Sequence, residues 1–229
     1  MKENLITGSN NEILDHLFHA EYGTHSILVY PNIETLRETY SRYVKMQLED
    51  NNEIVLILPY YETANNVRKI LSEGFVNNIA DGNDSVVVVA TVNGTKNNSI
   101  IDVARHEKEG SLIIMDSVKG YFGSGNDHDD DDNNTDLMAF VKQLVKKAES
   151  SGKNGVSVIA DLGSFYHYHH NSKTADKLFE YELSLPSSYD GMKLKGFCIY
   201  HKQDLDKRFT EEQKQKLRDH HGKALMIVN

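Results

Sequence analysis

Aromatic, acidic and other polar side chains follow a series of short apolar segments in this sequence, and they are the residues best suited to hold a ligand. A tyrosine offers a flat apolar ring and one hydroxyl group, while Asp, Asn, Ser and His can orient the polar part of a bound molecule. We expect these side chains to form one site for a small organic ligand. The residues assigned to this site are Tyr30, Asn32, Tyr60, Tyr61, Asp116, Asp161, Ser164, Tyr200 and His201.

Nucleotide hydrolysis is not expected, because the loop that would wrap a phosphate is missing. Such a loop needs glycines, a lysine and a Ser or Thr where a strand turns into a helix. The first such turn instead reads Tyr30-Pro-Asn-Ile-Glu-Thr35, which contains no Gly or Lys, and Pro31 lacks an N–H donor. Asp116 and Asp161 each end an apolar segment, as the Mg²⁺-binding acid of an ATPase does. Any buried strand that ends in Asp fits that pattern, so these two residues are not sufficient to predict a nucleotide site.

Three clusters of histidines raise the alternative of a metal site. They are His16-x-x-His19, Tyr166-His-Tyr-His-His170 and His220-His221. A metal site needs three or four converging ligands, and the sequence has neither a His-Glu-x-x-His motif nor a pair of cysteines. The second cluster follows the segment that ends at Asp161, so the metal candidates are His167, His169 and His170. The other two clusters are expected to be solvated surface histidines, and no cofactor is assigned.

The remaining reactive side chains do not suggest catalysis. Cys198, the single cysteine, lies in the apolar run 196–200 and is expected to be buried and inert, and it excludes an internal disulfide. Glu180 and Glu182 are two positions apart on an expected helix, so they point in different directions and do not form an acid–base pair. No Gly-x-Ser-x-Gly motif is present. We therefore expect a binding protein rather than an enzyme.

Seven short apolar segments are expected to be the strands that position these residues. Most of them are continuous runs of Val, Ile and Leu, which is typical of strands buried on both faces of a parallel sheet. The expected strands are Ile27–Tyr30, Ile54–Leu58, Val86–Val92, Leu112–Met115, Val156–Ala160, Phe197–Tyr200 and Ala224–Val228.

Segments with helical spacing of apolar residues separate these runs. The expected helices cover 33–50, 62–73, 99–109, 136–151, 174–185 and 210–221. The alternation of strand and helix predicts a three-layer, doubly wound α/β fold with a mostly parallel sheet. In such sheets, ligands bind beyond the carboxyl ends of the strands. The assigned site residues lie at those ends.

The chain is expected to contain one α/β domain, residues 25–229, after a helical extension over residues 1–24. Ile13, Leu14 and Leu17 indicate a short amphipathic helix in this extension. Two segments interrupt the alternation of strands and helices. Residues 77–98 are expected to be a peripheral insertion, and the acidic segment 123–135 is expected to be a mobile loop.

Composition narrows the partners further. The 229 residues are 39% hydrophobic and carry a formal net charge of −9. This charge repels phosphate backbones, which disfavours general nucleic-acid binding. No apolar run approaches the ~20 residues that a membrane-spanning helix needs, and the polar start of the sequence does not read as a secretory signal. We expect a cytoplasmic protein that binds neither nucleic acid nor membranes.

Four motifs carry a resemblance to a known family. They are His25-Ser-Ile-Leu-Val-Tyr30, His106-Glu-Lys-Glu-Gly-Ser-Leu-Ile-Ile-Met115, the segment 155–163, and Leu178-Phe-Glu-Tyr-Glu182. From Tyr22 onward the chain resembles the MEDS family, the methanogen/methylotroph, DcmR-type sensory domain of archaeal and bacterial proteins. The motifs are similar to that family's His-x-Cys-x-x-Tyr strand, its helix–Gly–strand step, its later strand ending in Asp, and its Leu-x-Glu-Tyr-Glu helix. The chain departs from the family at Ile27, where the family often has Cys, and in 77–98 and 123–135.

The resemblance implies a RecA/KaiC-like fold that has lost its P-loop, and a non-enzymatic sensory module for a small organic ligand. The sequence shows no attached helix-turn-helix or kinase segment, so signalling is expected to pass through a regulatory partner protein. RecA-like relatives also suggest a homo-oligomer. Two alternatives stay open. One is a degenerate RecA/KaiC-like ATPase scaffold that binds nucleotide or protein without turnover, and the other is a metal-dependent enzyme that uses the histidines of 166–170.

Overall fold

The computed structural model describes residues 5–74, 100–122, 137–167 and 174–228. Its centre is a seven-stranded sheet in the order β1-β7-β2-β6-β5-β3-β4, and every neighbouring pair of strands in it is parallel. The strands are β1 (Leu5–Gly8), β2 (His25–Tyr30), β3 (Ile54–Leu58), β4 (Leu112–Ile114), β5 (Val156–Asp161), β6 (Leu194–His201) and β7 (Lys223–Ile227).

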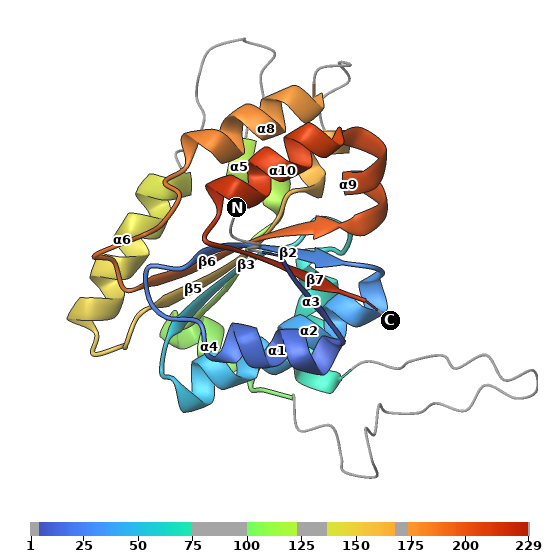
Figure 1. The fold of residues 1–229 in the computed structure, drawn as a ribbon. Helices are drawn as coiled ribbons and strands as arrows, with labels where there is room; N and C mark the ends of the chain where they lie inside the picture. The colour runs from blue at the N-terminus through green and yellow to red at the C-terminus, as the bar shows by residue number, and fades with distance from the viewer. Residues whose placement is uncertain (1–4, 75–99, 123–136, 168–173, 229) are drawn as a thin grey trace, which may run out of the picture.

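Helices cover both faces of this sheet and give a three-layer α/β, RecA-like fold (Figure 1). One face carries α1 to α4, and the other carries α5 to α10. The helices are α1 (Asn10–Phe18), α2 (Ile33–Lys45), the π-helical η1 (Met46–Asp50), α3 (Ala64–Glu73), α4 (Val103–Glu109), α5 (Ser117–Phe122), α6 (Leu137–Ser150), α7 (Gly163–His167), α8 (Thr174–Ser184), α9 (Lys202–Arg208) and α10 (Glu211–His220). None of the described helices is long and apolar enough to cross a membrane.

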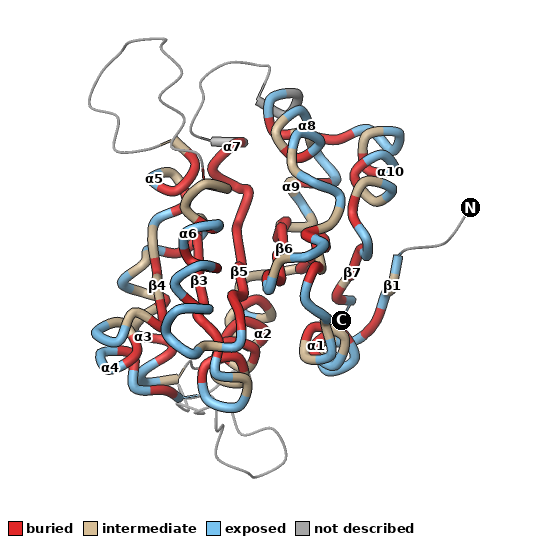
Figure 2. The backbone as a smooth tube through the Cα atoms, turned by 90° about the vertical axis from the view of Figure 1, so that its left-hand side faces the viewer, coloured by how far each residue is buried: buried red, intermediate tan, exposed pale blue. Residues whose placement is uncertain are grey.

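The four central strands, β2, β3, β5 and β6, are almost entirely buried because each sends side chains into two separate cores (Figure 2). Leu28 and Tyr30 of β2 belong to the core beneath α1 and α2. Ile27 and Val29 of the same strand belong to the opposite core, beneath α6 and α8. Successive side chains of a strand point to opposite faces, so two cores require apolar residues at both parities. This requirement explains the continuous apolar runs in the sequence.

Side-chain caps fix where several helices begin. Ser9 and Glu12 form a capping box at the start of α1, in which each side chain bonds the other residue's backbone N–H. Thr63 caps α3 in the same position by accepting from the Asn66 N–H. At the other end, α4 stops at Gly110, whose φ of 69° lies in the left-handed region that favours glycine.

The structure confirms the α/β fold and shows that the sheet is entirely parallel where it is described. Six of the seven expected strands are present, and the seventh, 86–92, lies outside the described residues, as do the segments 77–98 and 123–135. The sequence analysis missed strand β1 and the short helices α5, α7 and α9. Because β1 pairs with β7, the segment 1–24 contributes a strand to the sheet as well as the expected amphipathic helix α1.

A buried ion pair joins three strands at their amino ends. Lys195 Nζ lies 2.6 Å from Glu53 Oε1, and the two side chains are 6% and 0% exposed. Glu53 also accepts from the Tyr22 hydroxyl at 2.9 Å and from Ser157 Oγ at 2.5 Å, and Lys195 donates to Gln47 Oε1 at 3.2 Å. Glu53 directly precedes β3, Ser157 lies in β5 and Lys195 lies in β6. Both charges are therefore compensated by several bonds inside the protein.

Replacing Lys195 by Met should destabilise the protein strongly. The substitution leaves Glu53 as an uncompensated buried charge, which typically costs about 3–5 kcal/mol. Chemical denaturation monitored by circular dichroism measures the free energy of unfolding. The matched control is Lys216→Met, which breaks the exposed pair of Lys216 with Glu212 and should have little effect. Equal stability of the two variants would show that the buried pair does not matter for the fold.

Candidate functional site

Two of the assigned site residues meet at the carboxyl edge of the sheet. Tyr30 ends β2 and Asp161 ends β5, with β6 between these two strands. The Tyr30 hydroxyl donates to Asp161 Oδ2 at 3.2 Å, and Asp161 Oδ1 accepts from the Gly163 N–H at 2.8 Å. Tyr30 is 0% and Asp161 is 1% exposed. The sheet thus brings a phenol and a carboxyl group together where both are buried from solvent.

This environment changes the proton affinity of both groups. Burial raises the pKa of Asp161 to about 7, against the opposing effect of the hydrogen bonds from Gly163 and Tyr30. The nearby carboxyl groups of Asp204 and Glu62 raise the pKa of Asp161 further. Burial also raises the pKa of the Tyr30 phenol well above its ordinary value. The Asp161 carboxyl therefore exchanges a proton close to neutral pH, whereas Tyr30 stays protonated.

Three further assigned residues surround this pair. The ring of His201 lies 5.3 Å from the Tyr30 ring and 5.4 Å from the Tyr61 ring, measured between centroids. The Tyr61 ring in turn packs edge-on against Tyr60 at 5.2 Å. The Tyr61 hydroxyl donates to a carboxylate oxygen of Asp204, at the start of α9. The tyrosines at the strand ends therefore contact one another and nearby acids.

Asn32 and Asp116 have local structural tasks. Asn32 caps α2, because its Oδ1 accepts from the Thr35 N–H at 2.9 Å. Asp116 Oδ1 accepts from the Val118 N–H at 2.9 Å at the beginning of α5. In a phosphate-binding loop, the free N–H groups at the start of the helix would face the nucleotide. At the start of α2, the Asn32 side chain accepts the Thr35 N–H instead.

Ser164 and Tyr200 are both buried. Ser164 is fully buried in α7, and its hydroxyl has no hydrogen-bond partner among the described residues. Tyr200 is 1% exposed and belongs to the core beneath α6 and α8, on the opposite face of the sheet from Tyr30. The structure thus gathers Tyr30, Asp161, His201 and Tyr61 into one cluster but separates Tyr200 from it.

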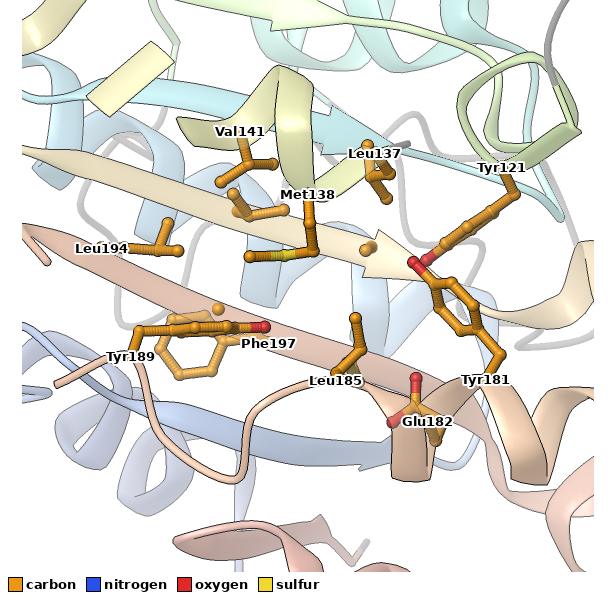
Figure 3. A pocket seen from close by; sticks show the side chains of 14 residues that line it. Tyr121, Leu137, Met138, Val141, Tyr181, Glu182, Leu185, Tyr189, Leu194 and Phe197 are labelled. Carbon is orange, nitrogen blue, oxygen red and sulfur yellow. The ribbon is translucent and has the colours of Figure 1, made fainter. Parts of the chain in front are cut away.

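An apolar cavity lies on that opposite face, between the sheet and helices α6 and α8. Figure 3 shows Leu137, Met138 and Val141 coming from α6 on one side, and Tyr181, Glu182 and Leu185 coming from α8 and the residue after it on the other. The space inside it that a water-sized molecule can reach is only about 30 Å³. The inner part is narrow, with room for roughly two or three water molecules. The cavity therefore fits only a small molecule unless its walls move.

The cavity continues outward into a wider recess between α6 and α8. The two spaces share five lining residues: Tyr121, Leu137, Met138, Tyr181 and Leu185. The outer recess adds polar groups from Lys142 and Ser184. A molecule can therefore approach from a polar entrance and reach an apolar interior.

Four potential metal ligands gather beside the inner end of this cavity. They are His25 from β2, Glu182 from α8, Cys198 from β6 and His221, which follows α10, and their ligand atoms all lie within 4.8 Å of one another. All four residues are buried, with exposures of 1%, 0%, 6% and 1% respectively. Glu182 and Cys198 also line the cavity. We call these four residues the His–Glu–Cys–His cluster.

The two histidines of the cluster hold their rings by backbone bonds. Nδ1 of His25 lies 2.7 Å from the Pro186 carbonyl oxygen, and Nδ1 of His221 lies 2.8 Å from that of Leu217. This leaves Nε2 of each ring facing the cluster. His25 Nε2 is 3.4 Å from Cys198 Sγ, and His221 Nε2 is 3.0 Å from Glu182 Oε2.

Burial changes the proton affinity of His25 and Cys198 in the cluster. Burial lowers the pKa of His25 to about 4, and the neighbouring His221 adds to this effect. Burial and the adjacent Glu182 raise the pKa of the Cys198 thiol. The expectation that Cys198 is buried is confirmed. The expectation that His221 is solvated is wrong, because the turn after α10 carries it beneath α8.

The metal ligands expected from the sequence, His167, His169 and His170, are not tested by the structure. His167 lies in α7, and His169 and His170 lie outside the described residues. The four clustered residues come from positions 25, 182, 198 and 221, so no local spacing signals them. The one available sign was that His25 and Cys198 lie within expected buried strands, where a side chain able to bind a metal can be shielded from water.

Comparison of the chain with models of known families, with curated proteins and with solved structures finds no match. The fold class is therefore defined by the topology of the sheet, and the function must be argued from the sites themselves.

Asp161→Asn should remove a pH dependence of stability. In the folded protein the pKa of this carboxyl is about 7, against 3.8 without burial, so the folded state binds more protons between these pH values. The free energy of unfolding of the wild type should fall as pH rises through this window and stay reduced above it. The Asn variant should gain stability relative to the wild type, by up to about 4 kcal/mol.

Denaturant unfolding of both proteins at about pH 5 and about pH 8 measures this difference. The control is Asp15→Asn, since the Asp15 side chain is 72% exposed. A constant difference between wild type and Asp161→Asn at both pH values would contradict the raised pKa.

Proposed function

We propose that this protein is a sensory module that binds a small, largely apolar organic molecule in the cavity between the sheet and helices α6 and α8. The observation that carries the proposal is the cavity itself, which is apolar inside and opens through a polar recess. Small-molecule sites in proteins are concave, mostly apolar and furnished with a few polar groups. Here the polar groups at the inner end belong to Glu182 and Cys198.

The dimensions of the cavity favour a compact ligand. The inner part admits only a few heavy atoms, whereas the outer recess is larger. Tyr121 and Tyr181, whose ring centroids are 5.6 Å apart, line both spaces. Rotation of either ring would change the width of the passage between them. This arrangement favours a compact ligand that fits entirely within the cavity and the recess, without a long chain that extends into solvent.

The carboxyl edge of the sheet is a weaker place for the same ligand. Tyr30 is fully buried and bonded to Asp161, and the Tyr61 hydroxyl is bonded to Asp204. A ligand at this edge would have to displace these bonds, which costs the desolvation of buried polar groups. The cavity on the other face requires no such exchange.

The sensory role rests on how the cavity is built and on the resemblance to the MEDS family. Two of its walls are helices on the surface of the domain, and its floor is the sheet. A ligand between them would bias the position of α6 or α8 by its differential affinity for the two arrangements. A partner protein that contacts these helices would then read the occupancy. No chemical step is needed for this function.

Filling the cavity should abolish ligand binding. Met138 lines both the inner cavity and the recess, so Met138→Trp places a large ring in the passage. Ligand-observed NMR with isopropanol, chloroform and cyclopentane as probes measures binding by the wild type. We expect at least one probe to bind, and the Trp variant to bind it at least about tenfold more weakly. Native mass spectrometry of freshly purified protein gives a second readout, because a retained organic mass identifies the natural ligand.

The matched control lies at the carboxyl edge. Tyr60→Ala removes a partly exposed ring from the assigned strand-end site and leaves the cavity unchanged. If Tyr60→Ala abolishes binding and Met138→Trp does not, the ligand binds at the strand ends and the cavity assignment fails. If the wild type neither binds a probe nor retains an organic mass, the sensory proposal itself fails.

A further inference from the structure

The His–Glu–Cys–His cluster has the composition and shape of a metal site. Four ligand atoms, two nitrogens, one sulfur and one carboxylate oxygen, converge to within 4.8 Å. In a tetrahedral zinc site, bond lengths of about 2.0–2.3 Å place neighbouring ligand atoms about 3.3–3.6 Å apart. The separations of 3.4 Å between His25 and Cys198 and of 3.0 Å between His221 and Glu182 are close to this value. Small side-chain movements would complete the coordination.

The hydrogen bonds that hold the two histidine rings also favour metal binding by the cluster. A histidine that binds a metal through one ring nitrogen usually donates from the other to a carbonyl or carboxylate, which fixes its tautomer and orientation. Both histidines here use Nδ1 for a backbone carbonyl oxygen, at Pro186 and Leu217. The lone pair of each ring is therefore on Nε2, the atom that faces the cluster. The two rings lie against one another with centroids 4.2 Å apart.

Among the described residues, the buried Glu182 carboxylate has one ionisable partner of opposite charge, His221, whose Nε2 lies 3.0 Å from Glu182 Oε2. Glu53, the other carboxylate with no exposed surface, has Lys195 and two hydroxyl donors. Glu62 has Arg37 and the Tyr40 hydroxyl. Glu182 has no Lys or Arg partner among the described residues, and neither of its oxygens, nor Nε2 of His221, makes a hydrogen bond of normal geometry there. A buried carboxylate in that situation is costly unless a cation joins it.

We propose that His25, Glu182, Cys198 and His221 bind a single zinc ion. Two neutral imidazoles, one carboxylate and one thiolate would neutralise the double positive charge of the ion inside the protein. The mixed nitrogen, sulfur and oxygen set is typical of zinc, whereas magnesium and calcium prefer sites made of oxygen atoms alone. Binding releases the thiol proton of Cys198 to the solvent, because the thiolate is the ligand.

The ion would connect parts of the chain that are far apart in sequence. His25 begins β2 and Cys198 lies in the neighbouring strand β6. Glu182 comes from α8, and His221 directly follows α10. Four protein ligands make a closed site without a position for water, which is the arrangement of a structural zinc. The ion would therefore fix α8 and the end of α10 to the face of the sheet.

Cobalt substitution tests the site directly. The full chain is freed of metal with a chelator and titrated with Co²⁺, and then with Zn²⁺ in competition with a chromogenic chelator. Because Cys198 is the single cysteine of the chain, a thiolate-to-cobalt charge-transfer band can arise only from this cluster. We expect that band, visible absorption of tetrahedral Co²⁺, and one bound zinc per chain. Absence of the band from folded wild-type protein overturns the proposal without any variant.

Variants locate the ligands. Cys198→Ser should remove the charge-transfer band, and Glu182→Gln, which keeps the shape of the side chain, should weaken zinc binding at least about 100-fold. The matched controls are His19→Gln in the exposed end of α1 and the double substitution His169→Gln with His170→Gln. Both controls should bind zinc like the wild type. If the histidines of 166–170 are required instead, zinc binds there and the cluster is not its site.

If one variant fails to fold, circular dichroism identifies it and its metal binding is not interpreted. The test then rests on the cobalt spectrum of the wild type, which needs no variant. Zinc should also raise the thermal midpoint of the wild type, and should raise that of folded Glu182→Gln by less at the same zinc concentration. An equal rise in both would overturn the assignment. None of these measurements uses an organic probe, so the metal site and the ligand-binding proposal succeed or fail separately.

Discussion

The structure depends on one constraint, which is that a parallel sheet must be covered by helices on both faces. Each strand then contributes apolar side chains to two cores, and every polar group that enters these cores must find its partner inside the protein. At the amino ends of the strands, Glu53 meets Lys195 and two hydroxyl groups, so the condition is met by the chain alone. At the carboxyl edge, Asp161 accepts hydrogen bonds from a hydroxyl group and a backbone N–H, and its pKa is raised to about 7.

On the opposite face of the sheet, buried polar groups lie beside an empty space. The core beneath α6 and α8 is not completely filled, and its empty space ends at Glu182 and Cys198. This space opens through a recess and ends at polar groups, and it is where the proposed ligand would bind. The carboxyl edge, where this class of fold usually binds its ligand, is instead occupied by contacts among the protein's own tyrosines, His201 and Asp204.

Sequence reasoning found the elements that obey strong periodicity and missed those that do not. Continuous apolar runs predicted β3 and β5 well, because such runs can be buried only in a sheet covered on both faces. Strand β1 escaped notice because it has four residues and mostly exposed or intermediate side chains, and its pairing with β7 at the edge of the sheet is set by tertiary contacts. The neighbours Tyr30 and Asp161 were predictable, since both end strands. Burial of His221 was not, because the turn that carries it under α8 has no signal in the surrounding polar helix.

The two proposals share residues for a physical reason. Glu182 and Cys198 border the cavity on one side and the cluster on the other, and both sit on elements that a bound cation would hold in place. With the cation bound, Tyr181 and Leu185, which flank Glu182 on the same segment, keep a fixed distance from the sheet. A rigid wall keeps a small apolar pocket open and specific, because little entropy is then lost when a ligand binds. The metal would thus act on ligand binding through the position of α8, without contact between the ion and the ligand.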